Sequence, residues 1–126
     1  MKLNFRSTTS GAWVADVGEI QCFNYHPEGP DQTALALADD LTDGMDTSLR
    51  RARDYLDLFV DRGKACGDPQ EDWQLIEMEL GTQHANGRPF VRLCFDLHGD
   101  DGGYWSVYFR QAQNEIRPYQ FDRTQG

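Results

Sequence analysis

Four aspartates crowd into the stretch ADDLTDGMD, residues 38–46, and three more follow along the segment behind it. Carboxylates at this density can ligate a metal, exchange protons or attract a cationic partner. A calcium loop of the EF-hand type is excluded, because with Asp39 at its first position the third position is Leu41. The spacing favours a solvated turn with a helix cap, or a surface that binds a positively charged protein.

Two glutamates and two histidines are the other candidates for chemistry. Glu77 and Glu79 share one face of a predicted strand, which suits an acid–base pair and equally suits a solvent-facing strand. His84 and His98 flank the next predicted strand, but histidines in turns are usually solvated rather than bound to zinc. The sequence has no nucleophile elbow, P-loop or dinucleotide fingerprint. We therefore predict no metal, no cofactor and no enzymatic activity.

The charge balance narrows the kind of partner. The chain of 126 residues has a net charge of -9, and residues 28–79 alone hold 14 acidic and 5 basic side chains. Nucleic acids and anionic membranes attract lysine and arginine, so neither is an expected partner. A basic protein is the natural complement of this middle segment.

Length and composition predict a single globular domain over residues 1–126. No apolar run is long enough to cross a bilayer, and the start lacks the apolar core of a secretory signal. Cys22, Cys66 and Cys94 are odd in number and widely separated, which argues against a disulfide framework. We expect a soluble, cytoplasmic protein with reduced cysteines.

Hydrophobic periodicity predicts the elements that position these side chains. Alternating patterns predict several strands, the first two joined by a tight turn at Gly18 and the last confined to a sheet edge by Pro118. The stretch QTALALADD is ambiguous between helix and strand, and we favour a strand because an acidic turn ends it so soon. The strands are expected near residues 13–17, 20–25, 32–40, 73–80, 88–99, 104–110 and 116–121.

The clearest helix spans residues 46–63, with Asp46 or Thr47 as its cap and Gly63 at its end. Apolar residues recur every three or four positions on one side of this segment. Strands, one helix and then more strands predict an α+β fold, a mostly antiparallel sheet with one long amphipathic helix packed on one face.

Seven aspartates fall on the turn before this helix and on its outer face. We predict that they form one acidic surface, which either steers and binds a cationic partner or only keeps the domain soluble. The predicted partner-binding residues are Asp39, Asp40, Asp43, Asp46, Asp54, Asp57 and Asp61.

This layout resembles the immunity proteins of bacterial polymorphic toxin systems, which include contact-dependent growth inhibition, Rhs and type VI effectors. The likeness lies in WQLIEMELG at residues 73–81, followed by FVRLCFDLHGDDGGYWSVYFR at residues 90–110. It implies a protein that binds one cognate toxin domain, often a basic nuclease, and covers its active site. No catalytic residue follows from the resemblance.

Two other interpretations stay open at this point. A small ligand-binding or enzymatic α+β domain would hold a pocket between helix and sheet, with Glu77, Glu79 or His98 functional. An acidic mimic of nucleic acid would instead inhibit a DNA-binding protein, and it differs from an immunity protein only in its partner.

Overall fold

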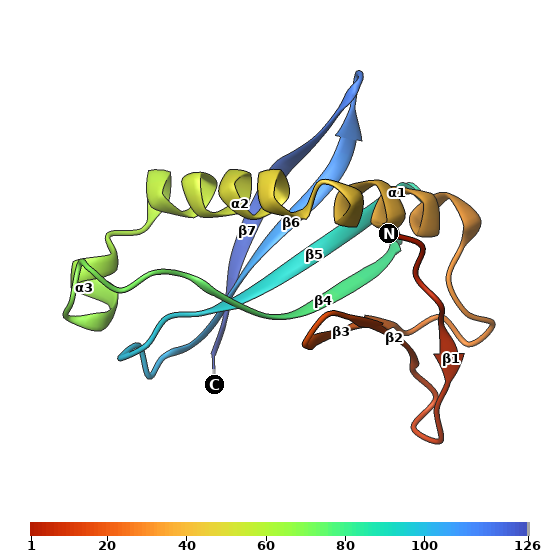
Figure 1. Cartoon of the computed structure of the whole chain (residues 1–126), viewed down its shortest axis with the longest axis horizontal. Coiled ribbons are helices and arrows are strands. Elements are labelled where there is room, and N and C mark those ends of the chain that lie inside the picture. Colours follow the sequence, from red (N-terminus) through yellow and green to blue (C-terminus); the bar gives the residue numbers. More distant parts are fainter. Residues whose placement is uncertain (126) are drawn as a thin grey trace.

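The computed structural model describes residues 1–125 and contains one seven-stranded sheet with three helices (Figure 1). Neighbouring strands in the sheet follow chain order and are antiparallel, except that β3 and β4 run parallel. The predicted α+β class with a mostly antiparallel sheet is confirmed. The strands are β1 (Arg6–Ser7), β2 (Trp13–Val17), β3 (Ile20–Asn24), β4 (Gln74–Thr82), β5 (Pro89–Asp96), β6 (Gly103–Ala112) and β7 (Glu115–Gln125).

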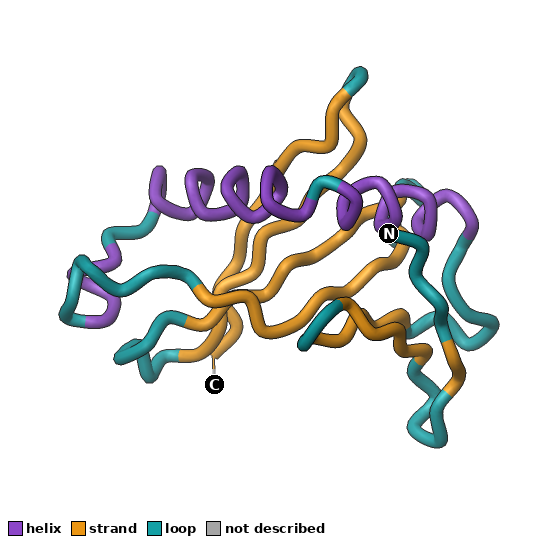
Figure 2. The backbone as a smooth tube through the Cα atoms, in the orientation of Figure 1, coloured by secondary structure: helices purple, strands orange, loops and turns teal. Residues whose placement is uncertain are grey.

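All three helices lie in the connection between β3 and β4. They are α1 (Gln32–Asp43), α2 (Met45–Phe59) and α3 (Arg62–Cys66). Helices α1 and α2 run nearly end to end across one face of the sheet (Figures 1 and 2), with α1 against β4 and β5 and α2 against β6 and β7. The prediction of a single long helix is therefore wrong, because two consecutive helices, α1 and α2, lie on this face.

The strand predicted over residues 32–40 is wrong, because this segment forms α1. Asp31 caps the helix by accepting hydrogen bonds from the backbone N–H groups of Thr33 (3.0 Å) and Ala34 (3.3 Å). The buried side chains of α1 recur at helical spacing and not at every second residue. They are Ala34, Leu37, Ala38, Leu41 and Thr42.

The second helix begins close to its predicted start and ends earlier than predicted. Val60 is extended, and Asp61 then caps α3 by accepting from the backbone N–H of Lys64 (3.2 Å). The left-handed residue that ends this segment is Gly67, with φ 84°, whereas Gly63 lies inside α3. Helix α2 therefore ends before Val60, and Asp61 begins α3 as its N-cap.

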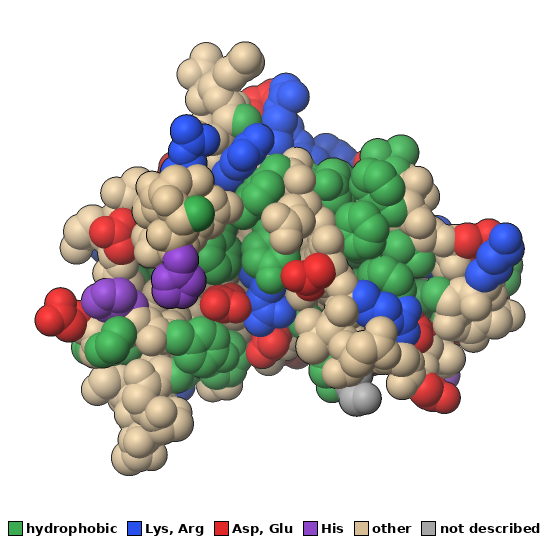
Figure 3. Space-filling view, turned by 180° about the vertical axis from the view of Figure 1, so that it is seen from behind, with side chains coloured by type: hydrophobic (Ala, Val, Ile, Leu, Met, Phe, Trp, Pro, Cys, Tyr) green, Lys and Arg blue, Asp and Glu red, His purple; other side chains and the backbone are tan. Residues whose placement is uncertain are grey.

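The core lies between the helices and one face of the sheet. Leu41 and Leu56 from the helices are fully buried with Met78, Leu93 and Val107 of β4, β5 and β6. Side chains alternate across a strand, so the intervening residues point to the other face. Among residues 1–125 no helix covers that second face, which Figure 3 views directly.

One feature of the remaining chain follows the sequence expectation. Pro118 lies in β7, which forms an edge of the sheet. Cys22 and Cys94 are buried, and burial raises the pKa of the Cys22 thiol to about 12. None of the helices in the described residues is long and apolar enough to cross a membrane.

Candidate functional site

The predicted acidic residues before α2 lie on α1 and not in a turn. Asp39 accepts a hydrogen bond from the backbone N–H of Leu3 (2.9 Å), and Asp43 pairs with the N-terminal ammonium group of Met1. Asp40 is exposed and has no ion pair within residues 1–125. Two of these three carboxylates therefore anchor the N-terminal segment.

The next two predicted residues also hold the fold. One oxygen of Asp57 accepts hydrogen bonds from the indole N–H of Trp73 (2.9 Å) and from Nε of Arg62 (3.1 Å). Trp73 is only 1% exposed, so this carboxylate satisfies a buried donor. Asp61 is occupied as the cap of α3. Both side chains therefore stabilise the fold whether or not a partner binds.

The last two, Asp46 and Asp54, are exposed on α2 beside basic side chains. A shallow hollow of about 540 Å³ contains them together with Arg50, Arg53 and Arg62. The arginines interrupt the continuous acidic surface that the sequence predicts. The structure thus spreads the seven aspartates over α1, α2 and the cap of α3, and gives four of them protein partners.

The uncovered face of the sheet carries a bridge between two carboxylates. Arg92 on β5 donates from Nε to Glu79 (2.9 Å) and from Nη2 to Glu77 (3.2 Å), and its third contact is the hydroxyl of Ser106 (2.9 Å). Burial lowers the pKa of Arg92, but the charge of Glu79 and the hydrogen bonds to Glu79 and Glu77 outweigh burial and raise it. Both glutamates are therefore fixed to one cation on rigid strands.

A second polar pair lies beside this bridge on β6 and β7. The hydroxyl of Tyr108 donates to Asp122 (3.0 Å), and burial followed by the charge of Asp122 raises the pKa of Tyr108 to about 12. Acidic and basic side chains accordingly meet in the middle of this face, with apolar side chains to both sides (Figure 3). The face combines fixed charges with aromatic rings, a composition that suits protein contacts.

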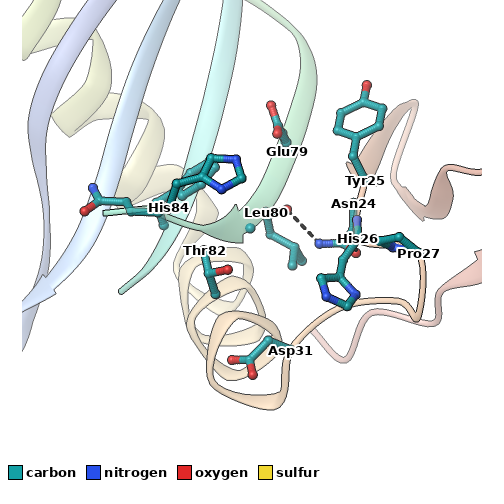
Figure 4. A pocket seen from close by; sticks show the side chains of 12 residues that line it. Asn24, Tyr25, His26, Pro27, Asp31, Glu79, Leu80, Thr82 and His84 are labelled. Carbon is teal, nitrogen blue, oxygen red and sulfur yellow. Dashed lines mark hydrogen bonds between the residues drawn. The ribbon is translucent and has the colours of Figure 1, made fainter. Parts of the chain in front are cut away.

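A groove opens where the two parallel strands separate. Strands β3 and β4 pair only at Cys22↔Met78 and Phe23↔Glu79. Beyond this point a single side-chain bond, from the amide of Asn24 to the carbonyl oxygen of Leu80 (3.0 Å), joins them (Figure 4). The groove has a volume of about 750 Å³. It is lined by Asn24, Tyr25, His26, Pro27, Asp31, Glu79, Leu80, Gly81, Thr82, Gln83, His84 and Phe90.

Two carboxylates and no lysine or arginine line this groove, counting residues 1–125. Glu79 and Tyr25 lie at one end and Asp31 at the other (Figure 4). Tyr25 is 60% exposed, and its pKa is raised by partial burial and then by the charges of Glu79 and Glu77, which outweigh the lowering by Arg92. The local field in the groove therefore favours a cation.

Gly81 gives the groove one of its walls. An added Cβ at this position would lie 3.1 Å from the ring of Phe90, its partner on β5. The missing side chain lets the ring fold over the strand, as aromatic residues do beside strand glycines. The groove is thus apolar along β5 and acidic at its ends.

The structure separates the histidines that a zinc site would need. His84 lines the groove, whereas His98 is exposed in the turn after β5. Across the described part of the chain, no group of three or more His, Cys, Asp or Glu side chains could hold a metal ion. Of the glutamates, Glu79 lines the groove and Glu77 lies outside it.

Sequence reasoning missed Asp31, Tyr25 and Thr82 as site residues. The only local signal is the loop HPEGPD, residues 26–31, which follows a strand and precedes the cap of α1. Crevices at the carboxyl ends of parallel strands commonly bind ligands, but the parallel pairing itself joins residues more than fifty positions apart.

No protein-family model, curated protein or solved structure matches this chain.

Proposed function

We propose that this protein is a neutralising binding protein of the immunity type, which binds a cognate basic toxin domain and covers its active site. The observation that carries the proposal is the groove at the end of β3 and β4. It holds the carboxylates of Glu79 and Asp31 and, within residues 1–125, no lysine or arginine. The carboxylates in the groove would compensate the positive charge of a lysine or arginine of the partner.

The surroundings of the groove support a contact with a protein. Glu79 is held by Arg92, so its carboxylate needs little ordering when a partner arrives. Tyr25 and Phe90 offer aromatic area beside it, and such residues dominate binding energy in interfaces. The net charge of -9 would speed the encounter with a basic partner at low ionic strength.

In this proposal the carboxylates on α1 and α2 steer the partner rather than dock it. Asp40, Asp46 and Asp54 are exposed, but arginines of α2 stand beside the last two. Interleaved charges weaken the local field, whereas the overall negative charge still acts at a distance.

A small-ligand or enzymatic role of the same groove is the second candidate. Its volume of about 750 Å³ lies in the usual range of ligand pockets, and Glu79 and His84 both line it. A nucleic-acid mimic would share the first proposal's chemistry and would differ in capturing a DNA-binding protein. The identity of the captured partner separates the two.

The test is capture of a partner by tagged protein at low salt from a lysate of the organism that encodes it. The groove variant combines Tyr25→Ala with Asp31→Asn, because asparagine still caps a helix. The matched variant combines Asp40→Asn, Asp46→Asn and Asp54→Asn on the helices. We expect one basic toxin domain to bind the wild type and the helix variant and to be lost by the groove variant.

Growth of cells that express the captured toxin supplies the functional readout. The wild type and the helix variant should restore growth, and the groove variant should not. Capture and protection by the groove variant, with loss by the helix variant, would move the interface to α1 and α2. Absence of any partner together with binding of a metabolite would favour the ligand-binding alternative.

A further inference from the structure

The edge of β4 that faces the groove is unpaired at Thr82. Its partner across the β4–β5 ladder is Pro89, which has no N–H, and the next residue, Gln83, donates its N–H to the carbonyl oxygen of Arg88 (2.9 Å). Hydrogen-bonded and non-bonded positions alternate along antiparallel strands. The N–H and C=O of Thr82 therefore point away from β5 and into the groove.

The carbonyl group of Leu80 confirms this direction independently. Leu80 lies two residues before Thr82, so its backbone groups point to the same side. Its carbonyl oxygen accepts the amide of Asn24 from β3, across the start of the groove. Asn24 thus closes one end of the slot, and the edge beyond it is free where β3 turns into the loop at His26 (Figure 4).

An unpaired strand edge inside a groove can template an added strand from another chain. An extended segment beside Thr82 would place every second side chain toward the face that carries Glu79 and Tyr25. The aromatic ring and the carboxylate suit a guanidinium or ammonium group. Arg92 pairs with Oε1 of Glu79 from outside the groove lining, which leaves Oε2 of Glu79 without a hydrogen bond among residues 1–125 and open to a second cation.

We propose that the edge of β4 at Thr82 takes an extended segment of the partner protein as an added strand, with an arginine or lysine of that segment beside Glu79 and Tyr25. This inference rests on the proposed function, because it names the part of a basic partner that the groove receives. Main-chain bonds at Thr82 give the affinity, and the cation at Glu79 gives the selectivity.

The probe is a blocked five-residue peptide with one central arginine flanked by threonine and valine, titrated into the full chain by NMR. The control peptide carries citrulline, which has the same shape and no charge. We expect the amide signals of Gly81 and Gln83 to shift, and the arginine peptide to bind about tenfold more tightly, the effect of one charge-assisted hydrogen bond. Equal binding of the two peptides would overturn the selectivity.

The chain offers a matched pair of variants for the carboxylate. Glu79→Gln and Glu77→Gln each remove one partner of Arg92, but only Glu79 lines the groove. Glu79→Gln should abolish the preference for arginine over citrulline, and Glu77→Gln should keep it. An equal effect of both variants would contradict a direct contact with Glu79.

Thr82→Pro and Thr82→Val test the added strand. Proline removes the N–H that points into the groove and leaves the ladder to β5 intact, whereas valine keeps the N–H. Thr82→Pro should weaken both peptides about tenfold, and Thr82→Val should not. A peptide methylated at its backbone nitrogens should bind the wild type as weakly, which tests the same bonds without changing the protein. Equal binding by the two variants, together with undiminished binding of the methylated peptide, would overturn strand addition.

Capture of the whole partner separates this inference from the proposed function. If Thr82→Pro still captures and neutralises the toxin as well as Thr82→Val does, strand addition is overturned and the immunity function stands. Loss of capture in Thr82→Pro alone supports both.

Discussion

The groove beside β4 and the hollow on α2 both contain carboxylates, but their surroundings differ. The groove has no lysine or arginine in its lining within residues 1–125, whereas three arginines stand among the carboxylates of the hollow. In the groove, Arg92 pairs with Glu79 from outside the lining, and Asp31 has no ion pair among residues 1–125, so the basic side chains that would oppose a cationic partner are fewer there than in the hollow. The neighbours of an acidic residue, and not the local number of acids, decide whether it is open to a partner.

The largest expected effect comes from removing the cation that fixes the carboxylates near the groove. Arg92→Met keeps the alkyl stem and leaves Glu77 and Glu79 without their shared partner. The side chain of Arg92 is only 14% exposed, so we expect a loss of about 3 kcal/mol in the free energy of unfolding. Urea denaturation measures it, with the exposed Arg88→Met as control. A loss below that of the control would show that the bridge does not hold the groove.

The next effect concerns the hollow on α2. Asp57→Ala removes the acceptor of the buried indole N–H of Trp73, and we expect a loss of about 1.5 kcal/mol. Asp54→Ala makes the same change in helix propensity without a buried partner, so its effect should stay within about 0.5 kcal/mol. Equal stability of the two variants by urea denaturation would mean that Asp57 is as free to bind a partner as Asp54.

Asp100, in the turn between β5 and β6, provides a test of a partnered carboxylate through pH. Burial raises the pKa of Asp100, but the hydrogen bonds from Arg123, Trp105 and the N–H of Gly102 have the larger effect. The pKa of Asp100 is therefore below its ordinary value of 3.8. A carboxylate whose pKa is lower in the folded protein stabilises the fold at pH values above its pKa in the unfolded chain. This stabilisation is lost as the pH falls through its pKa in the folded protein. Asp100→Asn should therefore lose about 1 kcal/mol near pH 6 and less near pH 3.

The exposed Asp101→Asn is the control for this pH series, because it changes the same charge one residue away. Stability curves of the wild type and Asp100→Asn that stay parallel from pH 6 to pH 3 would contradict the assigned role.

The smallest effect lies in the polar pair between β6 and β7. Asp122→Asn removes the charge that helps to raise the pKa of Tyr108, so this pKa should fall from about 12 toward its ordinary value of 10. We expect a stability change of only about 0.5 kcal/mol. NMR titration of the Tyr108 ring measures the pKa, and Asp96→Asn serves as control. An unchanged pKa would show that burial alone raises it.

Local patterns predicted most of the elements correctly. Alternation located β2 and β3 and the four long strands β4 to β7, and the apolar stripe located α2. Leu35 and Leu37 also fit a strand period, but the cap at Asp31 makes this segment the helix α1. The break at Gly44 between two nearly aligned helices carries no strong signal, since glycine also occurs within helices.

The candidate site was much less accessible to sequence reasoning. Glu79 stood among the alternatives because its spacing from Glu77 is visible in the sequence. Asp31, Tyr25 and Thr82 were not named, because they meet only through the parallel pairing of β3 with β4. The predicted acidic surface rested on charge alone, which does not show that Asp39, Asp43, Asp57 and Asp61 already have partners.

The sequence by itself determined the α+β class, the positions of β2, β3 and β4 to β7, and the negative charge of the middle segment, because these follow from local periodicity and composition. Only the tertiary structure decided which carboxylates have partners within the fold and which of them line the groove. Hydrogen bonds and ion pairs act over a few ångströms between residues that are distant in the chain, so their partners are fixed by the packing of the sheet and its helices.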